Sequence, residues 1–135
     1  MYNNIMIPVA LDHSADIRRS IAIASKLKDK GGTVTLVGVV EGVPDYVAEY
    51  MTVRNEDAIL DKVKARLLDI AGGRDDIRVA VMSGQPGVSI AEMAADIAAD
   101  LIIINSHRPN AQDYFLGSTA SRVVRRAPCS VIVLR

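Results

Sequence analysis

The sequence predicts an α/β protein with a five-stranded parallel sheet, doubly wound and flavodoxin- or Rossmann-like, with strand order 3-2-1-4-5. Two observations carry this prediction. Short apolar runs of strand length alternate along the chain with segments of helical periodicity, and strands that alternate with helices form parallel sheets through right-handed crossovers. The apolar runs are also continuous, which is typical of strands covered by helices on both faces.

The five apolar runs define the strands. The first reads NIMIPVAL, and the second, TVTLVGVV, is rich in β-branched residues, which favour strands. The last run, CSVIVL, follows an Ala-Pro pair. The predicted strands span residues 4–11, 33–40, 77–82, 101–105 and 129–134.

Four helices are predicted between these strands. Ser14 can cap the first, and the pair Gly31-Gly32 ends it. The second, longer helix spans residues 55–71, after a segment at 41–54 that has no clean periodicity and is predicted to be a partly ordered loop. Ser89 and Glu92 have the spacing of a capping box that opens the third helix, which runs to residue 98. The fourth helix spans residues 117–126.

Length and composition predict one domain covering residues 1–135, because no repeat, low-complexity tract or linker divides the chain. Sixteen basic and sixteen acidic residues cancel, so no global field attracts nucleic acid or an anionic membrane. No apolar run approaches the ~18 residues of a membrane span, and the N-terminus lacks a signal-peptide pattern. We therefore expect a cytoplasmic protein without nucleic-acid partners or membrane insertion. Cys129 is interpreted as a packing residue.

The last predicted helix opens on Gly117-Ser118-Thr119, a pattern that favours an anion site. The first turn of a helix presents free N–H groups and the positive end of its dipole, and here two hydroxyls are added. His107 and Arg108 stand in the loop just upstream, where an Arg fork can complete a phosphate site. The alternative is a plain helix start beside a solvated cation.

Topology points to the same place. In a doubly wound sheet, ligands bind at the carboxyl ends of the strands where the strand order reverses. The two loops richest in polar groups, residues 8–14 and 105–117, follow the first and fourth strands. If these strands are neighbours, both loops lie at that crevice.

Other occupants of such a fold are disfavoured by missing residues. The chain has neither GxxxxGK[ST] nor GxGxxG, so it has no P-loop or dinucleotide fingerprint. A phosphoacceptor receiver would need an Asp where Met82 and Ser83 stand, and the loop after the first strand lacks the Ser/Thr content expected for flavin. No Cys and His cluster has zinc spacing, so no metal site of the protein itself is predicted.

The C-terminal third resembles the universal stress protein family. Gly117-Ser118, followed by Ala127-Pro128-Cys129 and the strand VIV at residues 131–133, matches the family's motif. SHRP at Ser106 to Pro109, with Leu116-Gly117-Ser118, resembles a bacterial branch of the family. The likeness covers essentially the whole chain. Two upstream glycines of the family's G-x-x-G element are replaced by Asn105 and Arg108, which allow a close backbone approach to phosphate less readily than Gly does.

The resemblance implies a set of nucleotide-contacting residues. Asp12 takes the role of the family's Asp after the first strand if one residue is inserted there; otherwise Ala10 replaces that Asp, and Asp12 caps a helix. Three residues of the set have an alternative to a nucleotide contact. Val39 can instead belong to the sheet core, Gly84 can simply allow a turn, and His107 can be a plain loop residue. The implied set is Pro8, Val9, Asp12, Val39, Gly84, Asn105, Ser106, His107, Arg108, Gly117, Ser118 and Thr119.

The function that the resemblance implies is that of an ATP-binding, nucleotide-dependent regulator in the stress response. The ligand would be ATP, with AMP or ADP as alternatives, accompanied by Mg²⁺. The last strand, Cys129 to Leu134, would pair with its copy in a homodimer. The alternative is a dimeric interaction module that binds no nucleotide. Catalysis is left open, at most as slow ATP hydrolysis or as autophosphorylation on Ser118, Thr119 or Ser121, because no general base stands beside a nucleophile.

Overall fold

The computed structural model describes residues 1–10, 17–41, 53–106 and 116–135, with the backbone alone for 53–56. Its five parallel strands form one sheet in the order β3-β2-β1-β4-β5. The fold class and strand order predicted from the sequence are therefore confirmed. The strands are β1 (Tyr2–Val9), β2 (Lys28–Glu41), β3 (Ile77–Gly84), β4 (Leu101–Asn105) and β5 (Ser130–Leu134).

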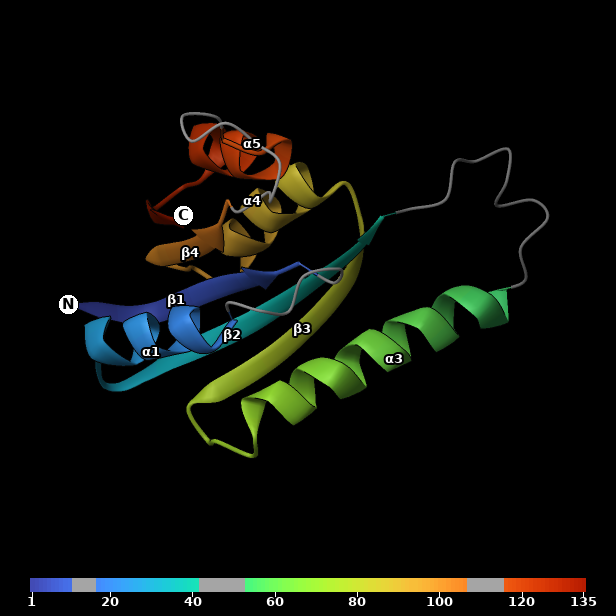
Figure 1. Ribbon diagram of the computed structural model, residues 1–135, viewed down its shortest axis with the longest axis horizontal. Helices are drawn as coiled ribbons and strands as arrows, with labels where there is room; N and C mark the ends of the chain where they lie inside the picture. Colours follow the sequence, from blue (N-terminus) through green and yellow to red (C-terminus); the bar gives the residue numbers. More distant parts are fainter. Residues whose placement is uncertain (11–16, 42–52, 107–115) are drawn as a thin grey trace.

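Helices cover both faces of this sheet, as Figure 1 shows. One face packs against α1 and α3, and the opposite face packs against α4 and α5. This arrangement explains the continuous apolar runs of the strands, since successive side chains point to opposite faces and both faces are buried. The helices are α1 (Ile17–Leu27), α3 (Val53–Ala71), α4 (Pro86–Asp96) and α5 (Ser118–Arg126).

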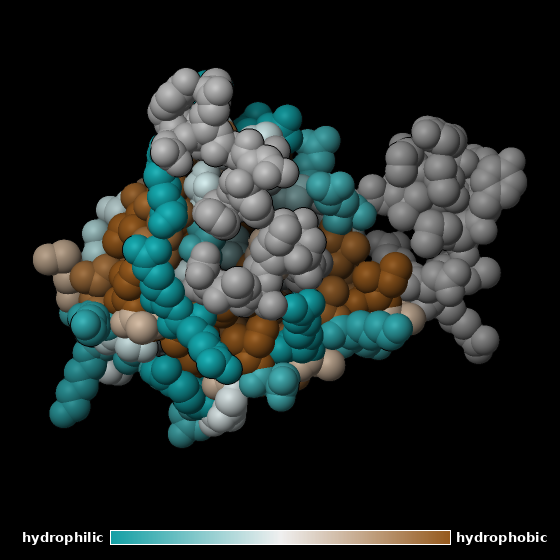
Figure 2. Space-filling model, in the orientation of Figure 1, coloured by the Kyte–Doolittle hydropathy of each residue, from teal (hydrophilic) through white to brown (hydrophobic). Residues whose placement is uncertain are grey.

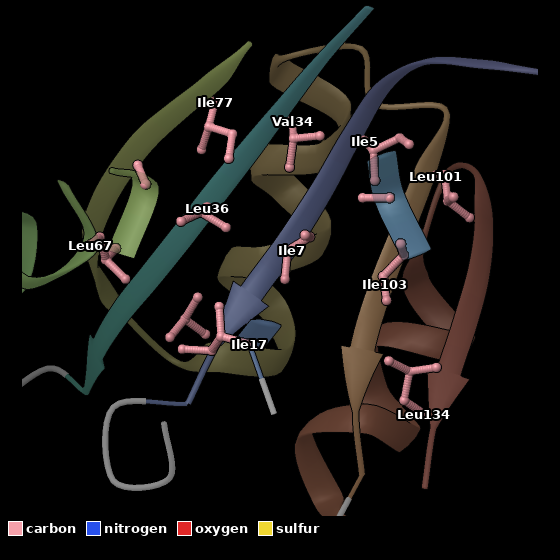
Figure 3. Packing of buried hydrophobic residues seen from close by; sticks show 13 residues of the cluster. Ile5, Ile7, Ile17, Val34, Leu36, Leu67, Ile77, Leu101, Ile103 and Leu134 are labelled. Carbon is pink, nitrogen blue, oxygen red and sulfur yellow. The ribbon is translucent and has the colours of Figure 1, made fainter. Parts of the chain in front are cut away.

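The core consists of two apolar layers built from aliphatic side chains. In the layer below α1 and α3, Ile5, Leu36 and Ile103 from three neighbouring strands lie on the same face of the sheet (Figure 3). In the layer below α4 and α5, Met6 and Ile102 point the other way. The central strands β1 and β4 are the most deeply buried, so the carboxyl ends of these two strands are held rigidly. On the face seen in Figure 2, hydrophilic residues surround the apolar ones.

The sequence predicted that the pair Gly31-Gly32 ends the first helix, and this prediction is wrong. The helix ends at Leu27, and β2 begins with Lys28. The glycines lie inside β2, where the pairing with β1 shifts register between Tyr2 and Asn4. Gly31 adopts a φ of +83°, which Gly allows without strain. The glycine pair therefore forms an irregularity in a strand rather than a helix stop.

The capping box at Ser89 and Glu92 was also wrongly predicted. The helix α4 starts three residues earlier, at Pro86, with Gln85 as the N-cap and no side-chain capping hydrogen bond. Proline suits the first turn because its missing N–H is not needed there. Ser89 is instead buried within the helix. The pattern of Ser three residues before Glu therefore falls inside a helix, where it caps nothing.

The end of α4 has the hydrogen bonds of a Schellman motif. Ala98 donates to the Ala95 carbonyl and Ala99 donates to the Ala94 carbonyl, and Ala94 and Ala99 are both buried in the same apolar layer. Ala98 has a φ of +54°, the left-handed conformation that usually carries Gly at this position.

Along the described ranges, no helix is long and apolar enough to cross a membrane.

Candidate functional site

The carboxyl ends of β1 and β4 lie side by side in the sheet. Ile5 pairs with Leu101 and Met6 with Ile102, and the same parallel register continued along both strands places Val9 beside Asn105. This is the point where the strand order reverses, which is where doubly wound sheets bind ligands. The two loops expected to hold the ligand therefore start from neighbouring strands.

Asn105, the last residue of β4, is tied to α1. Its side-chain Nδ2 donates to the Ser20 hydroxyl at 3.0 Å, and Ser20 is fully buried. The Asn105 amide nitrogen is thus engaged within the protein.

Ser106, the next residue, joins the ends of β5 and α5. Its backbone N–H donates to the Leu134 carbonyl at 2.8 Å, and its hydroxyl accepts the Gly117 N–H at 3.1 Å. The residues just before and just after the segment 107–116 are therefore held together by one hydrogen bond. As a result, the first turn of α5 lies against the end of β4.

The first turn of α5 presents its backbone N–H groups near the end of β4. Gly117 is the N-cap, its carbonyl accepts the Ser121 N–H at 2.9 Å, and no side chain of the described residues caps the helix. The N–H groups of the first helical residues have no partner within a helix. The turn contains no acidic residue, and Ser118 is exposed. The helix start therefore presents backbone donors and a positive dipole end, with no carboxylate in the first turn of the helix.

Other predicted site residues occupy the same edge of the sheet but lie further from α5. Val9, on the α1 face, and Val39, on the α4 face, are both buried in the core. Pro8 precedes Val9 and is buried. Gly84, at the end of β3, pairs with Glu41 of β2, two strands away from β4. Asp12, His107 and Arg108 lie outside the described residues.

Gly84 has a specific structural requirement. Its φ of +151° is one that L side chains rarely adopt, and a β-carbon there would collide with the Ser89 hydroxyl of α4. The missing side chain therefore lets the first turns of α4 pack against the end of β3. This is the turn function that the sequence offered as the alternative to a ligand contact.

A family model described as the universal stress protein family matches residues 1–135. The chain belongs to this family. A universal stress protein from Thermus aquaticus is 31% identical over 144 residues, covering 100% of both chains.

Two solved structures share this universal stress protein's fold. A hypothetical protein whose biochemical function was assigned from its structure superposes with a TM-score of 0.81 and 23% identity, covering 99% of this chain and 96% of the other. A universal stress protein in complex with cAMP superposes with a TM-score of 0.63 and 21% identity, covering 99% and 97%.

The family resemblance did not indicate Ser20, the acceptor for Asn105. The sequence does contain a signal for it. Ser20 lies three residues after Ile17 and four before Ala24, on the buried stripe of α1, and a hydroxyl at a core position needs a hydrogen-bond partner. Reading the stripe for a polar member, and not only for its apolar members, would have identified this residue.

Cys129 of this universal stress protein lies half-buried beside the apolar layer under α4 and α5. Burial raises the pKa of its thiol, and the nearby Asp100 carboxylate raises it further. A raised pKa keeps the thiol protonated and unreactive.

Within the described part of the chain, no group of three or more His, Cys, Asp or Glu side chains could hold a metal ion.

Proposed function

We propose that this universal stress protein binds ATP with Mg²⁺ at the carboxyl ends of β1 and β4, with the phosphates against the first turn of α5. The observation that carries the proposal is the Ser106–Gly117 hydrogen bond, which brings that turn against the end of β4. The uncapped N–H groups, the two hydroxyls of Ser118 and Thr119, and the helix dipole all favour a polyanion there.

Two further findings support a nucleotide. The site lies where the strand order reverses, the ligand position of doubly wound folds, and a structural neighbour is described in complex with cAMP. We propose that Asp12, His107 and Arg108, from the two loops at this edge, complete the site. The bound protein would act in the cytoplasm as a nucleotide-dependent regulator under stress, with ADP or AMP as alternative ligands.

The replacement of a family glycine by Asn105 is compatible with this proposal. Among the described residues other than glycine, Ala98 alone has a positive φ, so the backbone at Asn105 does not need the conformations reserved for Gly. The position can therefore carry a side chain without strain.

Thermal unfolding with and without ligand tests the site. ATP with Mg²⁺ at a hundred times its Kd should stabilise the folded state by about 2.7 kcal/mol and raise the Tm accordingly. Gly117→Leu should abolish the Tm shift, because its side chain fills the space in front of the helix start. The ligand-free Tm should stay nearly unchanged, since Gly117 has φ −60° and ψ 157°, which any residue adopts. A full ligand shift in Gly117→Leu would rule out this phosphate position.

The alternative function is a dimeric interaction module that binds no nucleotide. It is favoured if purified protein, after denaturation, releases no adenine nucleotide and if ATP leaves the Tm unchanged. Release of ATP, ADP or AMP in amounts near one per chain would exclude it.

We also propose a homodimer in which the outer edge of β5 pairs with its copy. β5 is an edge strand, and exposed apolar edges are usually covered or paired. The Leu134 carbonyl points toward β4, so by strand alternation Val131 and Val133 direct their N–H groups outward. Val133→Pro should thus yield a folded monomer in sedimentation, whereas Ile132→Pro should destabilise the fold by removing a β4–β5 hydrogen bond. A monomeric wild-type protein at micromolar concentration would contradict the dimer.

A further inference from the structure

A buried polar link joins α1 to the end of β4. Ser20 is 0% exposed, and its hydroxyl accepts the Asn105 Nδ2–H at 3.0 Å. Buried polar groups are costly without partners. The hydrogen bond therefore couples the buried Ser20 hydroxyl to the half-buried Asn105 amide.

The link belongs to a chain of hydrogen bonds that runs from α1 to α5. Asn105 is bonded to Ser20 on α1, and the following residue, Ser106, is bonded both to Leu134 of β5 and to Gly117 at the start of α5. These bonds fix the exit of β4 from three sides. The first turn of α5 is thereby connected to α1 through the consecutive residues Asn105 and Ser106.

The position of Ser20 in α1 gives the link a second role. The described part of α1 begins at Ile17, directly after the segment 11–16 that carries Asp12. The Ser20–Asn105 bond therefore connects the helix that follows one predicted ligand loop to the strand that precedes the other. Ligand sites need such supporting contacts to hold the groups that touch the ligand in place.

We propose that Ser20 and Asn105 form a positioning pair, which sets the first turn of α5 relative to α1 and so positions that turn for the phosphates of the nucleotide. Asn105 then acts through its bond to α1 rather than by contacting phosphate with its amide nitrogen. This inference rests on the proposed ATP site, and it adds a residue, Ser20, that does not touch the ligand.

A double-mutant cycle tests the pair. Ser20→Ala, Asn105→Ala and the double variant are compared for their Kd for ATP with Mg²⁺, well below the Tm of each. Each single variant should raise the Kd about fivefold, the effect of one net hydrogen bond. The double variant should raise it no further, because either change already breaks the pair. If Ser20→Ala fails to fold, Ser20→Cys takes its place in the cycle, because a thiol is a much weaker acceptor than a hydroxyl.

A matched control separates positioning from general stability. Thr33→Val removes a hydroxyl that donates to Asn4 Oδ1 at the opposite end of the sheet, and it should lower the Tm without changing the Kd. A Kd within twofold of wild type in both Ser20→Ala and Asn105→Ala, with wild type binding ATP, would overturn the positioning pair and leave the ATP site standing.

A ligand-free readout distinguishes failure of the pair from failure of the ATP site. The amides of Ser106 and Gly117 are both hydrogen-bonded, and in Ser20→Ala their hydrogen exchange, followed by NMR, should be about fivefold faster, while Thr33→Val leaves it unchanged. If wild type does not bind ATP, the proposed function fails. Unchanged exchange at both amides in Ser20→Ala would then overturn the pair as well.

Discussion

The two ends of the sheet differ in how they use their polar groups. At the amino-end edge, polar groups are satisfied within the protein: the Asp100 carboxylate accepts the N–H groups of Asn3 and Asn4 at 2.7 and 3.0 Å, and the Asn4 amide donates to the Ile97 carbonyl. At the carboxyl-end edge, the first turn of α5 has no side-chain cap among the described residues. The amino-end edge therefore uses its polar groups within the fold, and the carboxyl-end edge is where we propose that a ligand binds.

Among the described residues, the starts of α4 and α5 both lack a side-chain capping hydrogen bond, and both lie at the carboxyl-end edge of the sheet. Beside the start of α5, the Ser20–Asn105 and Ser106–Gly117 bonds connect the surrounding backbone. Helix N–H donors on a backbone connected in this way suit the anion site that we propose. Substitutions at the amino-end edge should therefore change the stability of the fold without changing the Kd for ATP.

The largest expected effect is a loss of stability caused by a substitution at the carboxyl-end edge. Gly84→Ala should lower the free energy of unfolding by about 3 kcal/mol, because its β-carbon meets Ser89 and its φ suits Gly alone. The matched variant, Gly73→Ala at the amino-end edge, has a φ of +75° and open space around it, so strain alone should cost about 1 kcal/mol. Urea unfolding measures both. Equal losses would show that the Ser89 contact is unimportant.

Next in size is the loss of the carboxylate at the amino-end edge. Asp100→Ala should destabilise the protein by about 2 kcal/mol, since two backbone N–H groups lose a charged acceptor. Asp100→Asn keeps one acceptor oxygen and should lose about half as much. The Kd for ATP, measured by calorimetry, should be unchanged in both variants. A raised Kd for ATP in either variant would show that the amino-end edge affects ligand binding, and it would contradict the difference between the two edges.

A smaller change of opposite sign is expected at the end of α4. Ala98→Gly should raise the free energy of unfolding by about 0.5 to 1 kcal/mol, because Gly adopts the left-handed Schellman position without strain. Ala95→Gly, on the exposed side of the same helix, is the control and should cost about 1 kcal/mol. Chemical denaturation of the two variants should therefore give shifts in opposite directions.

The smallest expected effect depends on pH. Hydrogen bonds from the Arg74 guanidinium hold the pKa of Asp76 below its usual value. The stability from this lowered pKa is present above the ordinary Asp pKa and is lost as the pH falls through the lowered one. Arg74→Gln should cost a few tenths of a kcal/mol at neutral pH, because the pair is largely exposed. The difference from wild type should vanish in acid, and its persistence there would exclude the ion pair as the cause.

Much of the fold could be predicted from apolar patterning. β4 was predicted with its observed bounds, Leu101–Asn105, because a run buried on both faces stands out from its polar flanks. The helix α3 was predicted two residues shorter than observed. The strand order followed from the family of folds that such alternation produces.

The errors arose where a local pattern has two structural solutions. Gly31-Gly32 can end a helix or distort a strand, and only its pairing with β1 decides between them. Ser89 and Glu92 have capping-box spacing, but Pro86 starts the helix earlier. At the site, the hydrogen bond from the Asn105 amide nitrogen to Ser20, 85 residues earlier in the chain, was not predicted. Such tertiary contacts cannot be read from spacing.

The central place of β1 has a consequence for how the protein folds during synthesis. β1 is made before the other four strands of the sheet, yet its second neighbour, β4, begins only at Leu101. A nascent chain that ends at Gly84 can pair β1, β2 and β3 but leaves the other edge of β1 open, and open edges pair readily with other chains. The sheet closes late, through contacts distant in sequence, which slows folding. Asp100, whose carboxylate accepts the N–H groups of Asn3 and Asn4, is synthesised just before β4. These hydrogen bonds help β4 to pair with β1, and this pairing covers the edge of β1 that was open in the nascent chain.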